Sequence, residues 1–142
     1  MASELLYQKG NNECATPNWL KESLFKGWYD PCPLSIAGIF QVDGLSQPWQ
    51  DRTYVNPPYS EPLKWVKKAI EENKKGKTVA LLLKLDCSTE WFRKIMDAGA
   101  HLLFINERLH FNEGEAAPFC SAIFILYSIS SLSESSTGEK YE

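Results

Sequence analysis

The sequence lacks the residues that would build a metal centre. It contains only two histidines and four cysteines. The cysteines are widely scattered without a Cys-x-x-Cys pair, and the histidines do not complete a ligand set. We therefore predict no metal site, and we expect free thiols in a reducing compartment. The residues concerned are Cys14, Cys32, Cys87, Cys120, His101 and His110.

Long apolar runs are also missing. No stretch approaches the roughly 18 consecutive apolar residues of a membrane-spanning helix, and no basic segment followed by an apolar one opens the chain. These absences predict a soluble, cytoplasmic protein that makes no membrane contact.

An excess of positive charge is absent as well. The 15 Lys and Arg residues are outnumbered by 18 Asp and Glu residues, which gives a formal net charge of −3. This balance argues against a broad electrostatic grip on nucleic acid. Any contact with DNA or RNA must then come from a local patch of positive charge.

What the chain does have is the composition of one globular domain. Its 142 residues are 44% hydrophobic and include five Trp, six Tyr and seven Phe, enough to bury a core. From Ser128 the sequence becomes Ser-rich and then charged. We therefore expect a domain over residues 1–127 and a disordered tail over residues 128–142.

The most informative stretch within this domain is Asn56-Pro57-Pro58-Tyr59. Two consecutive prolines remove two backbone donors, so a strand that begins near Arg52 must end here. The residue before a proline is held extended. The resulting corner presents the Asn56 amide, the Pro57 carbonyl and the Tyr59 ring, which can grip a planar amine while the ring stacks on its heterocycle. The alternative interpretation is a stiff turn with no chemistry.

This tetrapeptide resembles the catalytic motif of S-adenosylmethionine-dependent amino-methyltransferases, which include the DNA adenine-N6 methyltransferases. The resemblance implies that the Asn56 oxygen and the Pro57 carbonyl accept hydrogen bonds from the target amine. It also implies that Tyr59 stacks on a base flipped out of the duplex. The chemistry explains these residue types. The amine lone pair is delocalised into the ring, and two acceptors that pull the hydrogens out of plane localise it and offset the developing positive charge.

Three shorter motifs extend the resemblance. Thr16-Pro17 resembles the turn against the methionine end of the cofactor. Asp30-Pro31-Cys32 resembles the end of the first cofactor-binding strand, although the glycines that normally follow are missing apart from Gly38. Asp43-Gly44-Leu45 resembles the acidic turn near the cofactor adenine, with a plain turn as the alternative. Their order and short spacing resemble the small phage-type (Dam-like) DNA adenine methyltransferases over about residues 13–127.

The apolar patterns predict an α/β fold, and the resemblance implies an abbreviated Rossmann-like methyltransferase fold. We expect a mostly parallel sheet that ends in an antiparallel C-terminal hairpin strand. Asp30 and Asn56 would then lie at the carboxyl edge, where open α/β sheets bind ligands. The expected strands lie near Trp28–Asp30, Tyr54–Asn56, Val79–Leu85, His101–Asn106 and Ala122–Tyr127. The expected helices follow the N-caps Thr16, Ser60 and Thr89 and stop at Gly27, Gly76 and Gly99.

Lysines gather on and after the helix expected from Ser60. Such a cluster is usually a solvated face, and the functional alternative is an edge that faces DNA phosphates. The candidate nucleic-acid contacts are Lys64, Lys67, Lys68 and, further along the chain, Arg108.

Three classes of function fit this sequence. The first is S-adenosylmethionine-dependent methylation of adenine N6 in DNA, which we favour. The second is the same transfer to cytosine N4, an RNA base or a glutamine side chain, since all present a planar amine. The third is a methyltransferase-like nucleic-acid-binding module that holds no cofactor, which the missing glycines favour. We expect no separate target-recognition domain, so sequence specificity would be slight or come from loops, a homodimer or a partner subunit.

Overall fold

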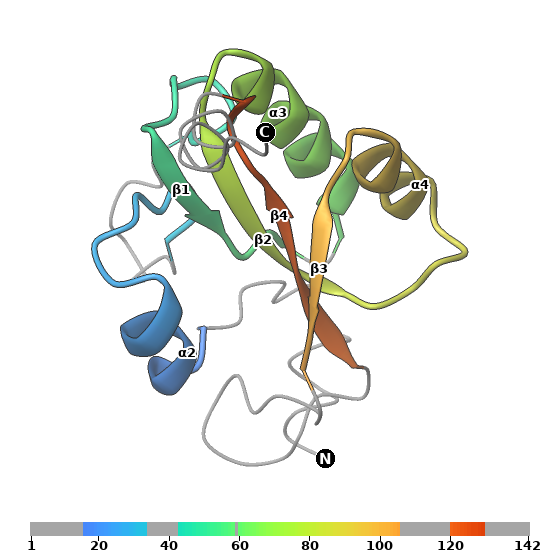
Figure 1. Cartoon of the computed structure of the whole chain (residues 1–142), viewed down its shortest axis with the longest axis horizontal. Coiled ribbons are helices and arrows are strands. Elements are labelled where there is room, and N and C mark those ends of the chain that lie inside the picture. The colour runs from blue at the N-terminus through green and yellow to red at the C-terminus, as the bar shows by residue number, and fades with distance from the viewer. Residues whose placement is uncertain (1–15, 34–42, 59, 106–119, 130–142) are drawn as a thin grey trace, which may run out of the picture.

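The computed structural model describes residues 16–33, 43–58, 60–105 and 120–129. These residues form helices on both sides of a four-stranded sheet (Figure 1). In chain order the elements are α2 (Asn18–Leu24), β1 (Arg52–Val55), α3 (Pro62–Lys74), β2 (Thr78–Lys84), α4 (Glu90–Asp97), β3 (His101–Phe104) and β4 (Ser121–Leu126).

The sheet has the strand order β1-β2-β4-β3. Strand β1 pairs with β2 in parallel, and β4 is antiparallel to both of its neighbours. The predicted α/β class and the antiparallel hairpin of the last two strands are confirmed. The expectation of a mostly parallel sheet is wrong, because one of the three strand pairings among the described residues is parallel and two are antiparallel. Strand β4 inserts between β2 and β3, where a parallel pairing would otherwise form. Strands β1, β2 and β3 still point in the same direction, so their carboxyl ends share one edge.

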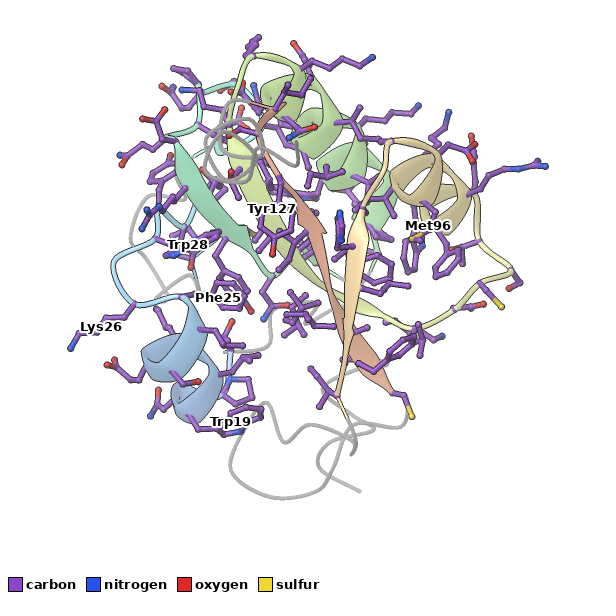
Figure 2. All side chains as sticks on the ribbon, in the orientation of Figure 1. Trp19, Phe25, Lys26, Trp28, Met96 and Tyr127 are labelled. Atoms are coloured by element: carbon purple, nitrogen blue, oxygen red, sulfur yellow. The ribbon has the colours of Figure 1, made fainter. Side chains whose placement is uncertain are left out.

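Each face of the sheet carries its own apolar cluster. Alternate residues of β2 point to opposite faces, so Val79, Leu81 and Leu83 join α3 and α4, while Ala80 and Leu82 face α2. Figure 1 shows α3 and α4 together above one side of the sheet and α2 apart from them. In Figure 2, Phe25 lies at the α2 side and Met96 at the α4 side. The sheet is therefore the middle layer, with helices on both faces.

Local signals explain most helix ends. Pro62 occupies the start of α3, and the Thr89 hydroxyl accepts a hydrogen bond from the Phe92 N–H at the start of α4. Gly76 and Gly99 follow the last turns with φ of 98° and 90°, which only glycine adopts readily. These predicted boundaries are confirmed.

Two predicted N-caps are wrong. The N-cap residues of α2 and α3 are Pro17 and Glu61, and neither helix has a side-chain cap. Ser60 lies one residue too early, because Pro62 sets the first turn of α3. The Thr16 hydroxyl bonds elsewhere, as described below. Gly27 has the expected positive φ of 81°, but α2 has already ended at Leu24.

The strand expected at Trp28–Asp30 is reduced to one parallel bridge between Tyr29 and Thr53. The Tyr29 N–H donates to the Arg52 carbonyl at 2.9 Å, and the Tyr54 N–H donates to the Tyr29 carbonyl at 2.8 Å. Gly27 and Pro31 leave no room for a longer ladder. The bridge nevertheless holds Asp30 beside β1, as the predicted strand would have done.

The C-terminal part of the described chain continues past β4. Ser128 is buried, and its N–H donates to the Thr78 hydroxyl at 3.1 Å. The domain boundary after residue 127 and the disordered tail stay predictions, since residues 130–142 lie outside the described residues. None of the helices described here is both long and apolar enough to cross a membrane.

Candidate functional site

The Asn56-Pro57-Pro58 corner lies where β1 ends, at the carboxyl edge of the sheet. Val55 is fully buried, Asn56 and Pro58 are half-buried, and Pro57 is buried. The prolines terminate the pairing of β1 with β2, and the chain then passes into α3. This placement of Asn56 agrees with the prediction. Tyr59, the last member of the motif, lies outside the described residues.

Asn56 is bonded to Thr16, which is 40 positions away in the sequence. The Asn56 Nδ2 group donates to the Thr16 hydroxyl at 3.2 Å, and the same hydroxyl lies 3.1 Å from the Tyr54 hydroxyl. Thr16 therefore links the Asn56 amide at the end of β1 to the phenol of Tyr54, two residues earlier in the same strand.

The Tyr54 side chain is fixed in the α2-side core. It is 2% exposed, and its ring stacks on Phe25 with centroids 4.3 Å apart. Burial raises the pKa of Tyr54 strongly; the hydrogen bond with Thr16 opposes this shift, and the charge of Asp30 adds to it. The phenol is therefore neutral at physiological pH and remains able to donate or accept.

Asp30 is held in a tight turn next to the bridge at Tyr29. Its Oδ1 atom accepts a hydrogen bond from the Cys32 N–H at 2.9 Å. Burial raises the pKa of Asp30, against the opposing effects of the Cys32 bond and the charge of Lys21. None of the ion pairs among the described residues involves Asp30. An acid retained under such conditions is typical of a functional site.

The second acidic turn packs directly on the first. Gly44 is buried, and a Cβ atom placed there would overlap the Pro31 carbonyl oxygen and lie 2.8 Å from its carbonyl carbon. Asp43 closes its own turn, because its Oδ1 atom accepts from the Leu45 N–H at 3.2 Å. The structure therefore brings Asp30-Pro31-Cys32 and Asp43-Gly44-Leu45 together, as the sequence predicted for one site.

Trp49 and Glu72 hold these turns in place through hydrogen bonds, and sequence reasoning missed the role of Glu72. The Trp49 indole N–H donates to the Gly44 carbonyl at 2.7 Å, and its backbone N–H donates to Glu72 at 3.4 Å. Glu72 is fully buried and pairs with Lys68 at 3.0 Å and with Lys75 at 3.5 Å. A signal was present in the sequence: Glu72 falls three residues after Ala69, on the apolar face of α3.

The charge of Glu72 survives burial. Burial works against the ionised form, but the hydrogen bonds from Lys68 and Trp49 and the charges of Lys68 and Lys75 outweigh it and lower the pKa of Glu72. The carboxylate thus anchors the Trp49 backbone to α3.

The candidate nucleic-acid contacts differ in their surroundings. Lys64 and Lys67 are exposed near the start of α3, and Lys64 pairs with Glu61 at 3.0 Å. The Lys68 side chain is only 13% exposed, pairs with Glu72 and lies over the Trp49 ring. Arg108 lies outside the described residues. A contact between these residues and nucleic acid stays a prediction.

An apolar hollow of about 340 Å³ opens between α2 and the carboxyl end of β3. Trp19 and Phe104 flank it and are 54% and 71% exposed. It offers no side-chain charge. Among the described residues, no cluster of three or more His, Cys, Asp or Glu could hold a metal ion.

Comparison with known proteins points to one family. The family model "DNA N-6-adenine-methyltransferase (Dam)" matches residues 40–128, more than half of the chain. A "DNA N-6-adenine-methyltransferase" of Haemophilus phage HP1 (strain HP1c1) is 39% identical over 74 residues, which cover 50% of this chain and 43% of the relative. A protein of the same name from Escherichia phage T1 is 39% identical over 56 residues, which cover 39% of this chain and 24% of the relative. The chain thus matches less than half the length of either relative. No solved structure matches it significantly.

Proposed function

Because the chain belongs to the DNA N-6-adenine-methyltransferase (Dam) family, we propose that it transfers a methyl group from S-adenosylmethionine to the N6 amine of adenine in DNA. The observation that carries this proposal is the corner at the end of β1. There the Asn56 amide and the Pro57 carbonyl follow the last paired residue of the strand, and the Asn56 nitrogen is turned toward Thr16.

The chemistry follows from the two acceptors. The Asn56 Oδ1 atom and the Pro57 carbonyl accept hydrogen bonds from the two N6–H groups, which localises the lone pair on the amine. S-adenosylmethionine, when bound, would supply the methyl group to N6, and the electron pair of its carbon–sulfur bond would stay on sulfur. The positive charge that develops on N6 is stabilised by the same two acceptors, and the surplus N6 proton leaves to solvent. Tyr59 completes this site by stacking on the extruded base.

The two acidic turns suit the cofactor. S-adenosylmethionine supplies a methyl group on a positively charged sulfur, and it also carries an ammonium group and ribose hydroxyls. Asp30 and Asp43 are acceptors for those groups, and Thr16 with Pro17 would lie toward the methionine end. The missing glycine loop is replaced by direct packing of Gly44 on Pro31, held by Trp49.

The fold supports the same proposal. Strands β1 and β2 are parallel, and β4 forms an antiparallel hairpin with β3. We infer an abbreviated Rossmann-like methyltransferase domain from these directions. DNA would approach the start of α3, where Lys64 and Lys67 are exposed, and a second subunit would supply further target recognition.

The test is a methylation assay on the purified chain. Duplex DNA, structured RNA and a glutamine-containing peptide are each incubated with S-adenosylmethionine, and the products are identified by mass analysis. N6-methyladenine in DNA supports the proposal. N4-methylcytosine, or product in RNA or peptide alone, would show that the chain methylates a different amine. No product, together with no cofactor binding by calorimetry, leaves the binding-module alternative.

A further inference from the structure

We propose that Thr16 is a positioning residue for Asn56, fixing which end of its amide faces the target amine. This inference rests on the proposed function, and it differs from the cofactor contact that the sequence predicted for Thr16. The bond between the Asn56 Nδ2 group and the Thr16 hydroxyl carries it.

The orientation of the amide decides whether Asn56 can work. One end of the side chain is an acceptor oxygen and the other is a double donor. An amine that presents its hydrogens can bond only to the oxygen. A half-turn of the amide would place donor against donor and remove one of the two acceptors. The bond to Thr16 occupies the nitrogen end and so directs Oδ1 the other way.

The Thr16 hydroxyl is itself well fixed. The Tyr54 hydroxyl lies 3.1 Å from it, and either group can be the donor in that bond. When the Thr16 hydroxyl donates to Tyr54, only its lone pairs remain for Asn56, so it can hold the Nδ2 end of the amide but not the Oδ1 end. Tyr54 is held by its stack on Phe25 and is 2% exposed. Thr16 also has a β-branched side chain, which restricts χ1.

No competing role for this hydroxyl appears in the helix that follows. The N-cap of α2 is Pro17, and no side chain caps the helix. The Pro17 carbonyl accepts from the Leu20 and Lys21 N–H groups at 3.1 Å each, which anchors the residue next to Thr16. The hydroxyl therefore serves the corner rather than the helix.

The test compares three variants with the parent. Thr16→Val removes the hydroxyl and keeps the shape, Thr16→Ser keeps the hydroxyl, and Tyr54→Phe removes only the outer support. Because one such bond contributes about a factor of ten, we expect kcat to fall about tenfold in Thr16→Val. We expect a fall of about threefold or less in the other two, and in all three variants the change in cofactor affinity should be smaller than the change in kcat. Ser23→Ala removes an exposed hydroxyl from α2, the helix that follows Thr16, and serves as the control.

A second readout is independent of turnover. In ¹⁵N-labelled protein, the NMR chemical shifts of the two Asn56 side-chain amide protons should be well separated in the parent and in Thr16→Ser. In Thr16→Val these chemical shifts should move toward the values of a free amide. Unchanged amide signals would overturn the proposal, as would a fall in cofactor affinity that accounts for the whole loss of rate. If the parent methylates nothing, the proposed function fails, whereas the amide signals still decide whether Thr16 orients Asn56. If Thr16→Val does not fold, the Asn56 amide signals of Tyr54→Phe replace it as the test. We expect these signals to shift part of the way, and unshifted signals would contradict the proposal.

Discussion

Gly44 packs so closely on Pro31 that even a methyl group at Gly44 would overlap the Pro31 carbonyl oxygen. The clash is with backbone, which cannot rotate away as a side chain could. The two acidic turns are therefore one unit, and the distance between Asp30 and Asp43 depends on the absence of a side chain at Gly44.

Gly44→Ala should force the two turns apart. Overpacking a closed site costs about 1–3 kcal/mol, so we expect the affinity for S-adenosylmethionine to fall about tenfold or more, measured by calorimetry. Gln47→Ala changes an exposed residue in the same loop and should leave affinity unaltered. Equal affinity for the parent and Gly44→Ala would remove these turns from the cofactor site.

Asp30→Asn should lower cofactor affinity without lowering the stability of the fold at neutral pH. Burial raises the pKa of Asp30 above its ordinary value of 3.8, so folding disfavours the charged form relative to the unfolded state. Its contribution to stability is present below pH 3.8 and is lost as pH rises through the raised pKa. At neutral pH the variant should be at least as stable as the parent, while cofactor affinity falls. A variant that is less stable at neutral pH but binds cofactor normally would show that Asp30 is structural.

Glu72→Gln should destabilise the fold. Hydrogen bonds to charged groups contribute about 1.5–3 kcal/mol, so we expect the free energy of unfolding to fall by about 2 kcal/mol at neutral pH. The pKa of Glu72 is lowered from 4.5, so its contribution is present above pH 4.5 and is lost as pH falls through the lowered pKa. The difference between variant and parent should shrink over that range in urea titrations.

The matched control for that change is Glu71→Gln. Glu71 is 63% exposed and pairs with Lys75 at 3.7 Å, so its loss should change stability by less than about 1 kcal/mol. Equal effects at the two positions would contradict the anchoring role of Glu72.

Lys67→Gln should weaken DNA binding through charge alone. Losing one phosphate contact reduces the slope of log affinity against log salt by about 1, which fluorescence anisotropy can measure. Lys68→Gln should instead lower thermal stability, since Lys68 is the closest partner of Glu72. Lys94→Gln, which removes a charge from α4, is the control for both variants. If Lys67→Gln leaves the salt slope unaltered, DNA does not approach the start of α3.

Features set by neighbouring residues were predictable from the sequence. Two prolines end β1 wherever the sheet lies, so Asn56 was placed correctly at the carboxyl edge. Gly76 and Gly99 marked helix ends in the same way. The carboxyl-edge rule then brought Asp30 and Asn56 to the same side of the fold.

Features that depend on contacts between distant segments were not predictable. Thr16-Pro17 matches a helix start locally, but the Thr16 hydroxyl bonds to Tyr54 and Asn56 instead. The antiparallel direction of β4 was predicted from its hairpin with β3, but its insertion between β2 and β3 leaves no local signal, because the apolar pattern of a buried strand does not identify its neighbours. The packing of Gly44 on Pro31 is likewise visible only in the fold.

We propose that Asn56 stabilises the reacting amine. We expect Asn56→Asp, which keeps an acceptor, to retain more activity than Asn56→Ala, and Asn18→Ala on the exposed face of α2 to match the parent.

The most direct measurement is the single-turnover rate of N6-methyladenine formation by the parent and Asn56→Ala, with cofactor saturating and its affinity determined in parallel. Loss of one charge-stabilising acceptor costs about 10²–10³ in rate. We expect a fall of at least that size with cofactor affinity unchanged. An Asn56→Ala variant that methylates adenine as fast as the parent would contradict it.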